Sequence, residues 1–301
     1  MKKKNITRRQ FVATLTAGAG TVFFGPSACA ILSGKSHSAT DPFRTITLGK
    51  TGIKTTLLGM GTGFNGGNRS SAITRAGVAE AVIRHAYETG IRFFDCADSY
   101  GTHPFTASAL KGIPRDKITL GSKMWVNPGG IPENERPDAS IVVDRFRKEL
   151  NTDYIDLVQM HCMLNGEWAS EHKRFMDGLE TLKAKNIIRA HGVSVHSFDA
   201  LKVASEDPWV DVIHVRINPF GDNMDQRDPA LVVPVIEKFH TSGKGVIAMK
   251  LIGGGKLKND PEKIEQSLKY VLGLGTVDMI IIGFESPEQI DNYITRMKNM
   301  G

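Results

Sequence analysis

The chain has 301 residues, of which 41% are hydrophobic and 23% charged, as in ordinary folded globular proteins. Most of its net charge of +6 lies in residues 1–30, which contain five basic side chains and no acidic one. The rest of the chain is nearly neutral and has no stripe of basic residues interleaved with aromatics, so nucleic acid is not expected as a partner.

Residues 1–30 have the organisation of an export signal. Basic residues precede an apolar stretch over 11–24, too short to span a bilayer, and Ala28-Cys29-Ala30 is an A-x-A cleavage pattern. The run Thr7-Arg8-Arg9-Gln10-Phe11-Val12 resembles a twin-arginine signal. An ordinary secretory signal with a chance arginine pair, or lipidation of Cys29, are the alternatives. We expect a twin-arginine-type signal peptide that delivers the protein, through the twin-arginine export machinery, to the periplasm or another extracytoplasmic space.

Residues 31–42 form a short linker, and strand-like and helical patterns alternate over 43–301. This alternation is typical of a parallel sheet built from βα units. The runs 44–48 and 54–58 flank Gly49-Lys50-Thr51-Gly52 and predict an opening hairpin. Strands are expected over 55–58, 92–95, 118–122, 157–161, 190–193, 212–216, 245–249 and 279–282. Helices are expected over 76–89, 138–150, 170–185, 231–240, 261–274 and 287–297.

Eight βα units predict an α/β protein, a (β/α)₈ TIM barrel with an N-terminal β-hairpin. The main alternative is an open, doubly wound sheet, which would carry a G-x-G-x-x-G turn after its first strand. Glycines at 59, 61 and 63 have a different spacing. After the leader, no stretch is long and apolar enough to form a stable membrane span in the mature protein.

Four polar residues lie at or just after the ends of the second, third and fourth strands: Asp95, Tyr100, Lys123 and His161. Active sites of such barrels lie at this end of the strands. A hydride that reaches a carbonyl carbon leaves charge on the oxygen, and Tyr100 is the candidate general acid. A neighbouring Lys123 would lower the tyrosine pKa from about 10, Asp95 would hold the lysine, and His161 would orient the substrate oxygen.

At these residues the sequence resembles the aldo-keto reductase family, over 43–301. The family's Asp-Tyr-Lys-His tetrad maps onto the four residues above, which implies an oxidoreductase that transfers a hydride between NAD(P)(H) and a small carbonyl or alcohol. The resemblance rests on Leu57-Leu58-Gly59-Met60-Gly61-Thr62, Phe94-Asp95-Cys96-Ala97-Asp98-Ser99-Tyr100-Gly101, Ser122-Lys123-Met124-Trp125, Asp153-Tyr154-Ile155-Asp156-Leu157, Ile188-Arg189-Ala190-His191-Gly192-Val193-Ser194, Gly245-Val246-Ile247-Ala248-Met249-Lys250 and the segment 283–292.

The resemblance also implies the cofactor contacts, although the nicotinamide end departs from the family pattern. Val195, His214 and Met249 stand where the family often has Asn, Gln and Tyr. Glu285 and Glu288 occur where many NADP-dependent members carry an Arg, and this favours NAD(H) over NADP(H). The expected cofactor-binding residues are Gly61, Thr62, Ser194, His214, Met249, Lys250, Gly253, Gly283, Gln289 and Asn292.

Two other classes of function stay open. A metal-dependent barrel hydrolase or isomerase is the first, since His161, His196 and His214 all fall near strand ends, although no H-x-H or H-x-x-x-H spacing occurs. The second is a non-catalytic nucleotide-binding partner protein on the same fold, which the altered nicotinamide end permits.

Overall fold

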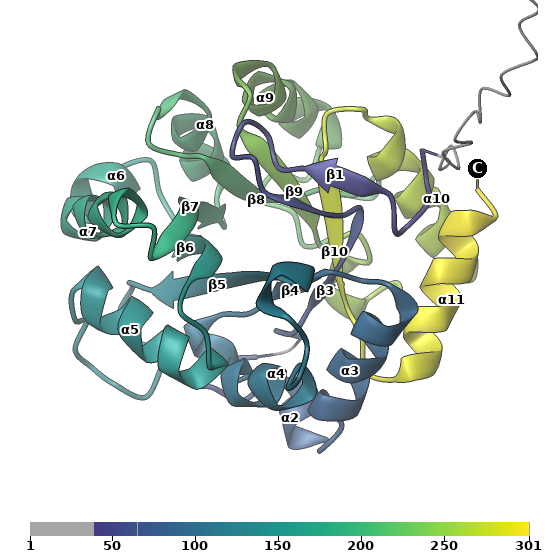
Figure 1. Ribbon diagram of the computed structural model, residues 1–301. Coiled ribbons are helices and arrows are strands. Elements are labelled where there is room, and N and C mark those ends of the chain that lie inside the picture. The colour runs from purple at the N-terminus through teal and green to yellow at the C-terminus, as the bar shows by residue number, and fades with distance from the viewer. Residues whose placement is uncertain (1–38, 65, 301) are drawn as a thin grey trace, which may run out of the picture. The chain divides into compact units, whose positions relative to one another are not determined.

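The computed structural model describes residues 39–64 and 66–300. The expected signal peptide and most of the expected linker therefore lie outside the described residues. Eight parallel strands close into a barrel with helices around its outside, which confirms the predicted (β/α)₈ fold (Figure 1). Around the barrel the strands are β3 Leu58–Gly61, β4 Phe93–Asp95, β5 Thr119–Trp125, β6 Ile155–Met163, β7 Ile188–Val195, β8 Val212–Arg216, β9 Gly245–Met249 and β10 Met279–Gly283.

The predicted hairpin is also present, as β1 Thr45–Thr47 paired antiparallel with β2 Lys54–Thr56. Its turn contacts the segments just before β9 and β10, because Lys50 N donates to Gly243 O and Gly49 N donates to Asp278 Oδ2. The hairpin therefore packs against the amino-terminal end of the barrel, opposite the end where an active site is expected.

The predicted first barrel strand, 55–58, is wrong in its position. Residues 54–56 belong to the hairpin, and the barrel strand β3 lies further along the chain, over Leu58–Gly61, so that it includes Gly59 and Gly61. The barrel interior explains those glycines: a Cβ at Gly59 would lie 2.6 Å from Met279 Cε and 3.1 Å from Phe93 Cδ1.

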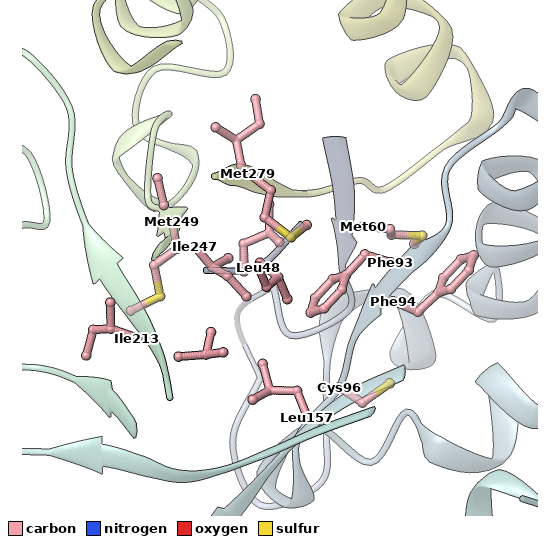
Figure 2. Packing of buried hydrophobic residues seen from close by; sticks show 14 of the residues in the cluster. Leu48, Met60, Phe93, Phe94, Cys96, Leu157, Ile213, Ile247, Met249 and Met279 are labelled. Atoms are coloured by element: carbon pink, nitrogen blue, oxygen red, sulfur yellow. The ribbon is translucent and has the colours of Figure 1, made fainter. Parts of the chain in front are cut away.

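Large apolar side chains fill the barrel interior, and they set which residues face the active-site end. Phe93 and Phe94 point in opposite directions, as successive strand residues do (Figure 2). A Cβ at Gly121 would lie 2.9 Å from Phe93 Cζ, so Gly121 faces the ring of Phe93 inside the barrel. Two residues further along β4 and β5, Asp95 and Lys123 face the interior in turn.

The described helices include the predicted series and three that the pattern did not indicate, which are α2 (Ala72–Arg75), α4 (His103–Ala109) and α8 (Phe198–Glu206). α4 is short, and two of its three buried residues, His103 and Thr106, are polar. Its sequence therefore lacks the periodic apolar residues by which a helix is predicted. None of the described helices is long and apolar enough to cross a membrane. The helices are α2 Ala72–Arg75, α3 Ala79–Thr89, α4 His103–Ala109, α5 Ala139–Leu150, α6 Trp168–Glu171, α7 Lys173–Ala184, α8 Phe198–Glu206, α9 Pro229–Ser242, α10 Pro261–Gly273 and α11 Pro287–Lys298.

Candidate active site

The four residues expected to form the catalytic tetrad come together at the carboxyl-terminal end of the barrel. Asp95 ends β4, and Tyr100 ends a single 3₁₀ turn, η2 (Asp98–Tyr100). Lys123 and His161 lie inside β5 and β6, because both strands run further than predicted. A hydrogen bond, an ion pair or a ring contact links each of the four to another member of the set.

Asp95 and Lys123 form a buried ion pair. Lys123 Nζ lies 2.5 Å from Asp95 Oδ1 and also donates to the carbonyl of Cys96 at 3.2 Å. Burial alone would raise the pKa of Asp95, but Lys123 and His214 together lower it to about 2. Burial lowers the pKa of Lys123, but Asp95 and Tyr100, with a small contribution from Cys96, together raise it above its ordinary value. Lys123 is therefore a fixed cation at neutral pH.

Tyr100 packs beside this cation, with Lys123 Nζ 5.3 Å from the centre of its ring. Two backbone hydrogen bonds from the loop after β3 hold its 3₁₀ turn, since Arg69 N donates to Ser99 O and Ser71 N donates to Tyr100 O. Burial raises the pKa of Tyr100 and outweighs the opposing effect of Lys123. The expectation that Lys123 would bring the tyrosine pKa below its ordinary value is thus wrong for the protein without ligands. The phenol stays protonated at neutral pH, as a proton donor must.

His161 completes the group as a neutral imidazole, because burial lowers its pKa well below the ordinary value. Its ring meets the Tyr100 ring edge to face at 5.5 Å, and the Trp125 ring at 5.1 Å. Nδ1 lies 3.4 Å from Ser99 Oγ. A neutral histidine fixed beside the phenol can hydrogen-bond a substrate oxygen and orient it.

A two-part groove opens beside the tetrad. A cavity of about 90 Å³ is lined by Asp95, Tyr100, Gly61, Met249 and Lys250, among others. A second cavity, of about 370 Å³, shares four wall residues with the first and continues toward α11. Gln289 and Asn292 line this second part. The shared wall residues are Phe64, Ile252, Gly255 and Gly283.

Near the middle of the groove, the side chain of Lys250 and the glycines that follow it can receive an anionic group of a ligand. Among the described residues, no acceptor is hydrogen-bonded to Lys250 Nζ, and burial lowers the pKa of this lysine, with Arg216 and Lys123 adding to the effect. Gly253, Gly254 and Gly255 follow it with positive φ angles, and a Cβ at Gly255 would lie 2.9 Å from the Phe64 ring. An anion placed here would gain a charge partner and a backbone free of side chains.

Other expected cofactor residues have different neighbours. Thr62 Oγ1 donates to Asp95 O and contacts Thr102 Oγ1, so it braces the backbone behind the carboxylate. Ser194 Oγ accepts a hydrogen bond from Cys162 N. His214 is fully buried, with Nε2 3.2 Å from Asp95 Oδ1.

The groove also has wall residues that the sequence patterns did not single out. Leu251 and Ile252 line the first part of the groove, and Lys258 and Arg296 line the second. Arg296 lies on α11 beyond 283–292, the segment that carries the resemblance. The residues described contain no group of three or more His, Cys, Asp and Glu arranged to hold a metal ion, and His161, His196 and His214 do not form one.

The closed (β/α)₈ barrel and the Asp, Tyr, Lys and His side chains that meet at its carboxyl-terminal end are the features of an aldo-keto reductase. The chain belongs to the aldo/keto reductase family, whose model matches residues 57–267.

Three known proteins illustrate the relation. Aldo-keto reductase family 1 member A1 of Pongo abelii is 28% identical over 197 residues, which are 56% of each chain. The chain thus matches about half the length of this relative. An aldo-keto reductase of Pseudomonas aeruginosa superposes with a TM-score of 0.67 at 24% identity, over 87% of this chain and 97% of that one. One of Klebsiella pneumoniae, in complex with NADP and acetate, gives 0.61 at 17% identity over 84% and 89%. The structural likenesses show the shared fold.

Proposed function

We propose that this protein is an NAD(P)(H)-dependent oxidoreductase that interconverts a small carbonyl compound and its alcohol, with Tyr100 as the general acid. The observation that carries the proposal is the buried Asp95–Lys123 pair beside the Tyr100 phenol, at a groove that continues from Tyr100 to Gln289 and Asn292. Membership of the aldo/keto reductase family supports the same reaction.

The roles of the residues follow from their geometry. When bound, the nicotinamide supplies or accepts the hydride. Tyr100 donates its phenolic proton to the substrate oxygen as charge develops there, and Lys123 stabilises the phenolate that remains. Asp95 keeps the Lys123 ammonium charged and in place, since its carboxylate lies 2.5 Å from Nζ. The neutral His161 donates a hydrogen bond that orients the substrate oxygen.

The groove would hold the cofactor along its length. Met249, on the wall next to Tyr100, would pack against the nicotinamide, and Lys250 would pair with the phosphates. A nicotinamide dinucleotide as the ligand is supported by the Klebsiella pneumoniae structure, which is a complex with NADP.

We propose that the outer cavity, which would hold the adenosine end of the cofactor, favours NAD(H) over NADP(H). Glu285 and Glu288 both line the outer cavity, where they would repel a 2′-phosphate. The two cations there already have partners: Lys258 lies 3.5 Å from Glu285, and Arg296 donates to Asn292 Oδ1 and to Pro261 O.

We further propose that residues 1–30 are a twin-arginine-type signal peptide and that the mature protein works in the periplasm or another extracytoplasmic space. The support is the sequence alone, with its paired Arg8 and Arg9, apolar stretch and A-x-A pattern.

The central test is the Tyr100→Phe variant, assayed with an activated aromatic aldehyde or a quinone as surrogate substrate. We expect the variant to lose roughly 10²–10⁴ in carbonyl reduction while its nucleotide Kd changes little. Wild-type turnover by Tyr100→Phe would refute the assignment. Nucleotide binding without any turnover by the wild type would instead point to the non-catalytic partner protein.

A further inference from the structure

A chain of hydrogen bonds runs behind the Tyr100–Lys123 pair, on the helix side of the barrel wall. His103, the first residue of α4, occupies its centre. His103 Nε2 lies 2.8 Å from Ser122 Oγ, and His103 Nδ1 lies 2.7 Å from Glu149 Oε2. The imidazole ring is 2% exposed and packs edge to face on Phe146 at 4.7 Å. One buried side chain thus joins strand β5 to helix α5.

The series of hydrogen bonds continues from α5 back to the η2 turn, which carries Tyr100. Arg145 Nη1 donates to Glu149 Oε1 at 3.0 Å, and Arg145 Nη2 donates to Asp98 Oδ2 at 2.7 Å. The other Asp98 oxygen accepts from Arg69 Nε at 3.1 Å and from Nη2 at 3.0 Å. The Asp98 side chain is 2% exposed, so this carboxylate depends on the two arginines for its charge partners.

The two ends of this chain lie next to the two catalytic residues. Ser122 immediately precedes Lys123 on β5, and its side chain points outward where Lys123 points inward. Asp98 begins the η2 turn that Tyr100 ends, and His103 follows Tyr100 by three residues. The network, from Ser122 through His103, Glu149 and Arg145 to Asp98, therefore ties the segment that carries the acid to the strand that carries the cation.

We propose that this network, centred on His103, sets the separation between Tyr100 and Lys123, so that His103, Ser122 and Asp98 are positioning residues for proton transfer. The proposal rests on the function proposed above and adds residues that touch neither substrate nor cofactor. Ser122, His103 and Asp98 are buried, whereas Glu149 and Arg145 are 30% and 33% exposed. Satisfied hydrogen bonds of buried side chains hold the elements that they join in one arrangement.

The separation matters because the effect of Lys123 on the phenol is electrostatic. The interaction of two charges falls with their distance and weakens sharply once water enters between them. With Nζ 5.3 Å from the ring centre, a small retreat of β5 from the η2 turn would leave the phenolate less stabilised. Alcohol oxidation requires the phenolate, so its rate reports the separation directly.

The test compares His103→Phe with His103→Gln. Phenylalanine keeps ring packing on Phe146 and removes both hydrogen bonds, whereas the glutamine amide can still reach Ser122. For His103→Phe we expect the rising limb of alcohol oxidation against pH to move up by about one unit, a roughly tenfold loss at fixed pH. The nucleotide Kd should stay unchanged. His103→Gln should restore most of the loss, and Ser122→Ala, which breaks the same bond from the other side, should reproduce it.

His191→Phe is the matched control. His191 is also buried, at 1% exposed, its Nε2 lies 2.8 Å from Glu180 Oε2, and its ring stacks on Trp209 at 4.3 Å. It has no bond to the network, so this variant should lose stability without moving the pH limb. Equal pH limbs for wild type, His103→Phe and Ser122→Ala would overturn the proposal, as would an equal displacement in His191→Phe. Tyr100→Phe, measured alongside, separates the two failures: if it loses turnover while the network variants behave as wild type, the network proposal alone fails.

Discussion

Gly63 lies against the ring of Tyr100 so closely that a Cβ at position 63 would be 2.1 Å from Tyr100 Cζ. The two residues are 37 positions apart, and the loop after β3 brings them together through the bonds of Arg69 and Ser71 to the η2 turn. The position of the Tyr100 ring therefore depends on the absence of a side chain at Gly63 as well as on the η2 turn.

The first prediction uses this contact. Gly63→Ala should push the Tyr100 ring away from Lys123 and lower kcat for carbonyl reduction by roughly 10-fold or more, because a displaced general acid loses much of its contribution. Gly67→Ala is the matched control in the same loop, since an added Cβ there meets nothing within 4 Å. Steady-state kinetics on both variants, with circular dichroism to check the fold, decides. Equal kcat values for the two would contradict the contact's importance.

The tetrad itself followed from the sequence because strand periodicity is local. Asp95 ends β4 as the pattern indicated, Lys123 lies on the predicted neighbouring strand, which runs two residues beyond it, and alternation points both inward. The positioning network did not follow, because the Ser122–His103 and Arg145–Asp98 bonds join residues 19 and 47 positions apart. The direction of the Tyr100 pKa shift could not be predicted from the sequence either. Burial by the surrounding fold raises this pKa and outweighs the opposing effect of Lys123.

The second prediction concerns pH. Burial raises the pKa of Tyr100 above its ordinary value of about 10. Carbonyl reduction uses the protonated phenol, so its rate should stay level through neutral pH and fall only in the strongly alkaline range. Alcohol oxidation uses the phenolate and should rise with pH over the same range. The kcat of both directions, measured from pH 6 upward, tests this, and a reduction rate that declines through pH 7 would be inconsistent with Tyr100 as the acid.

The third prediction concerns the nucleotide. Calorimetric titration should show NADH binding at least as tightly as NADPH, because Glu285 and Glu288 line the outer cavity. Glu285→Gln should raise the affinity for NADPH more than that for NADH, since it removes a carboxylate and releases Lys258. NADPH bound more than about tenfold tighter than NADH by the wild type, roughly 1.4 kcal/mol, would rule out the preference.

The fourth prediction concerns export. Replacing Arg8 and Arg9 together by lysine keeps the charge of the leader but removes the arginine pair that the twin-arginine receptors read. The uncleaved precursor should then accumulate in the cytoplasm, as judged by cell fractionation and immunoblotting of a cytoplasmic and a periplasmic fraction. Lys2→Arg, which leaves the pair intact, is the control and should be exported. Normal processing of the double variant would assign the leader to the ordinary secretory route.

The fifth prediction concerns stability and follows from the Asp95–Lys123 pair. Both side chains are less than 5% exposed, so Lys123→Met leaves a buried carboxylate without its main cation. The free energy of unfolding should fall by about 3–5 kcal/mol at pH 7. The double variant Asp95→Asn, Lys123→Met should lose less than Lys123→Met alone, since no uncompensated charge remains. Urea unfolding of the wild type and the two variants gives the comparison.

The pH dependence of that loss identifies its cause. In the wild type the folded-state pKa of Asp95 is about 2, below its ordinary value of 3.8, so its stabilising contribution is present above pH 4 and lost as the pH falls toward 2. Without Lys123 the folded-state pKa rises instead, and ionised Asp95 opposes folding at neutral pH. The deficit of Lys123→Met should therefore shrink as the pH is lowered from 7 to 4. A deficit that is constant over this range would mean that lost packing, and not the orphaned Asp95 charge, destabilises the variant.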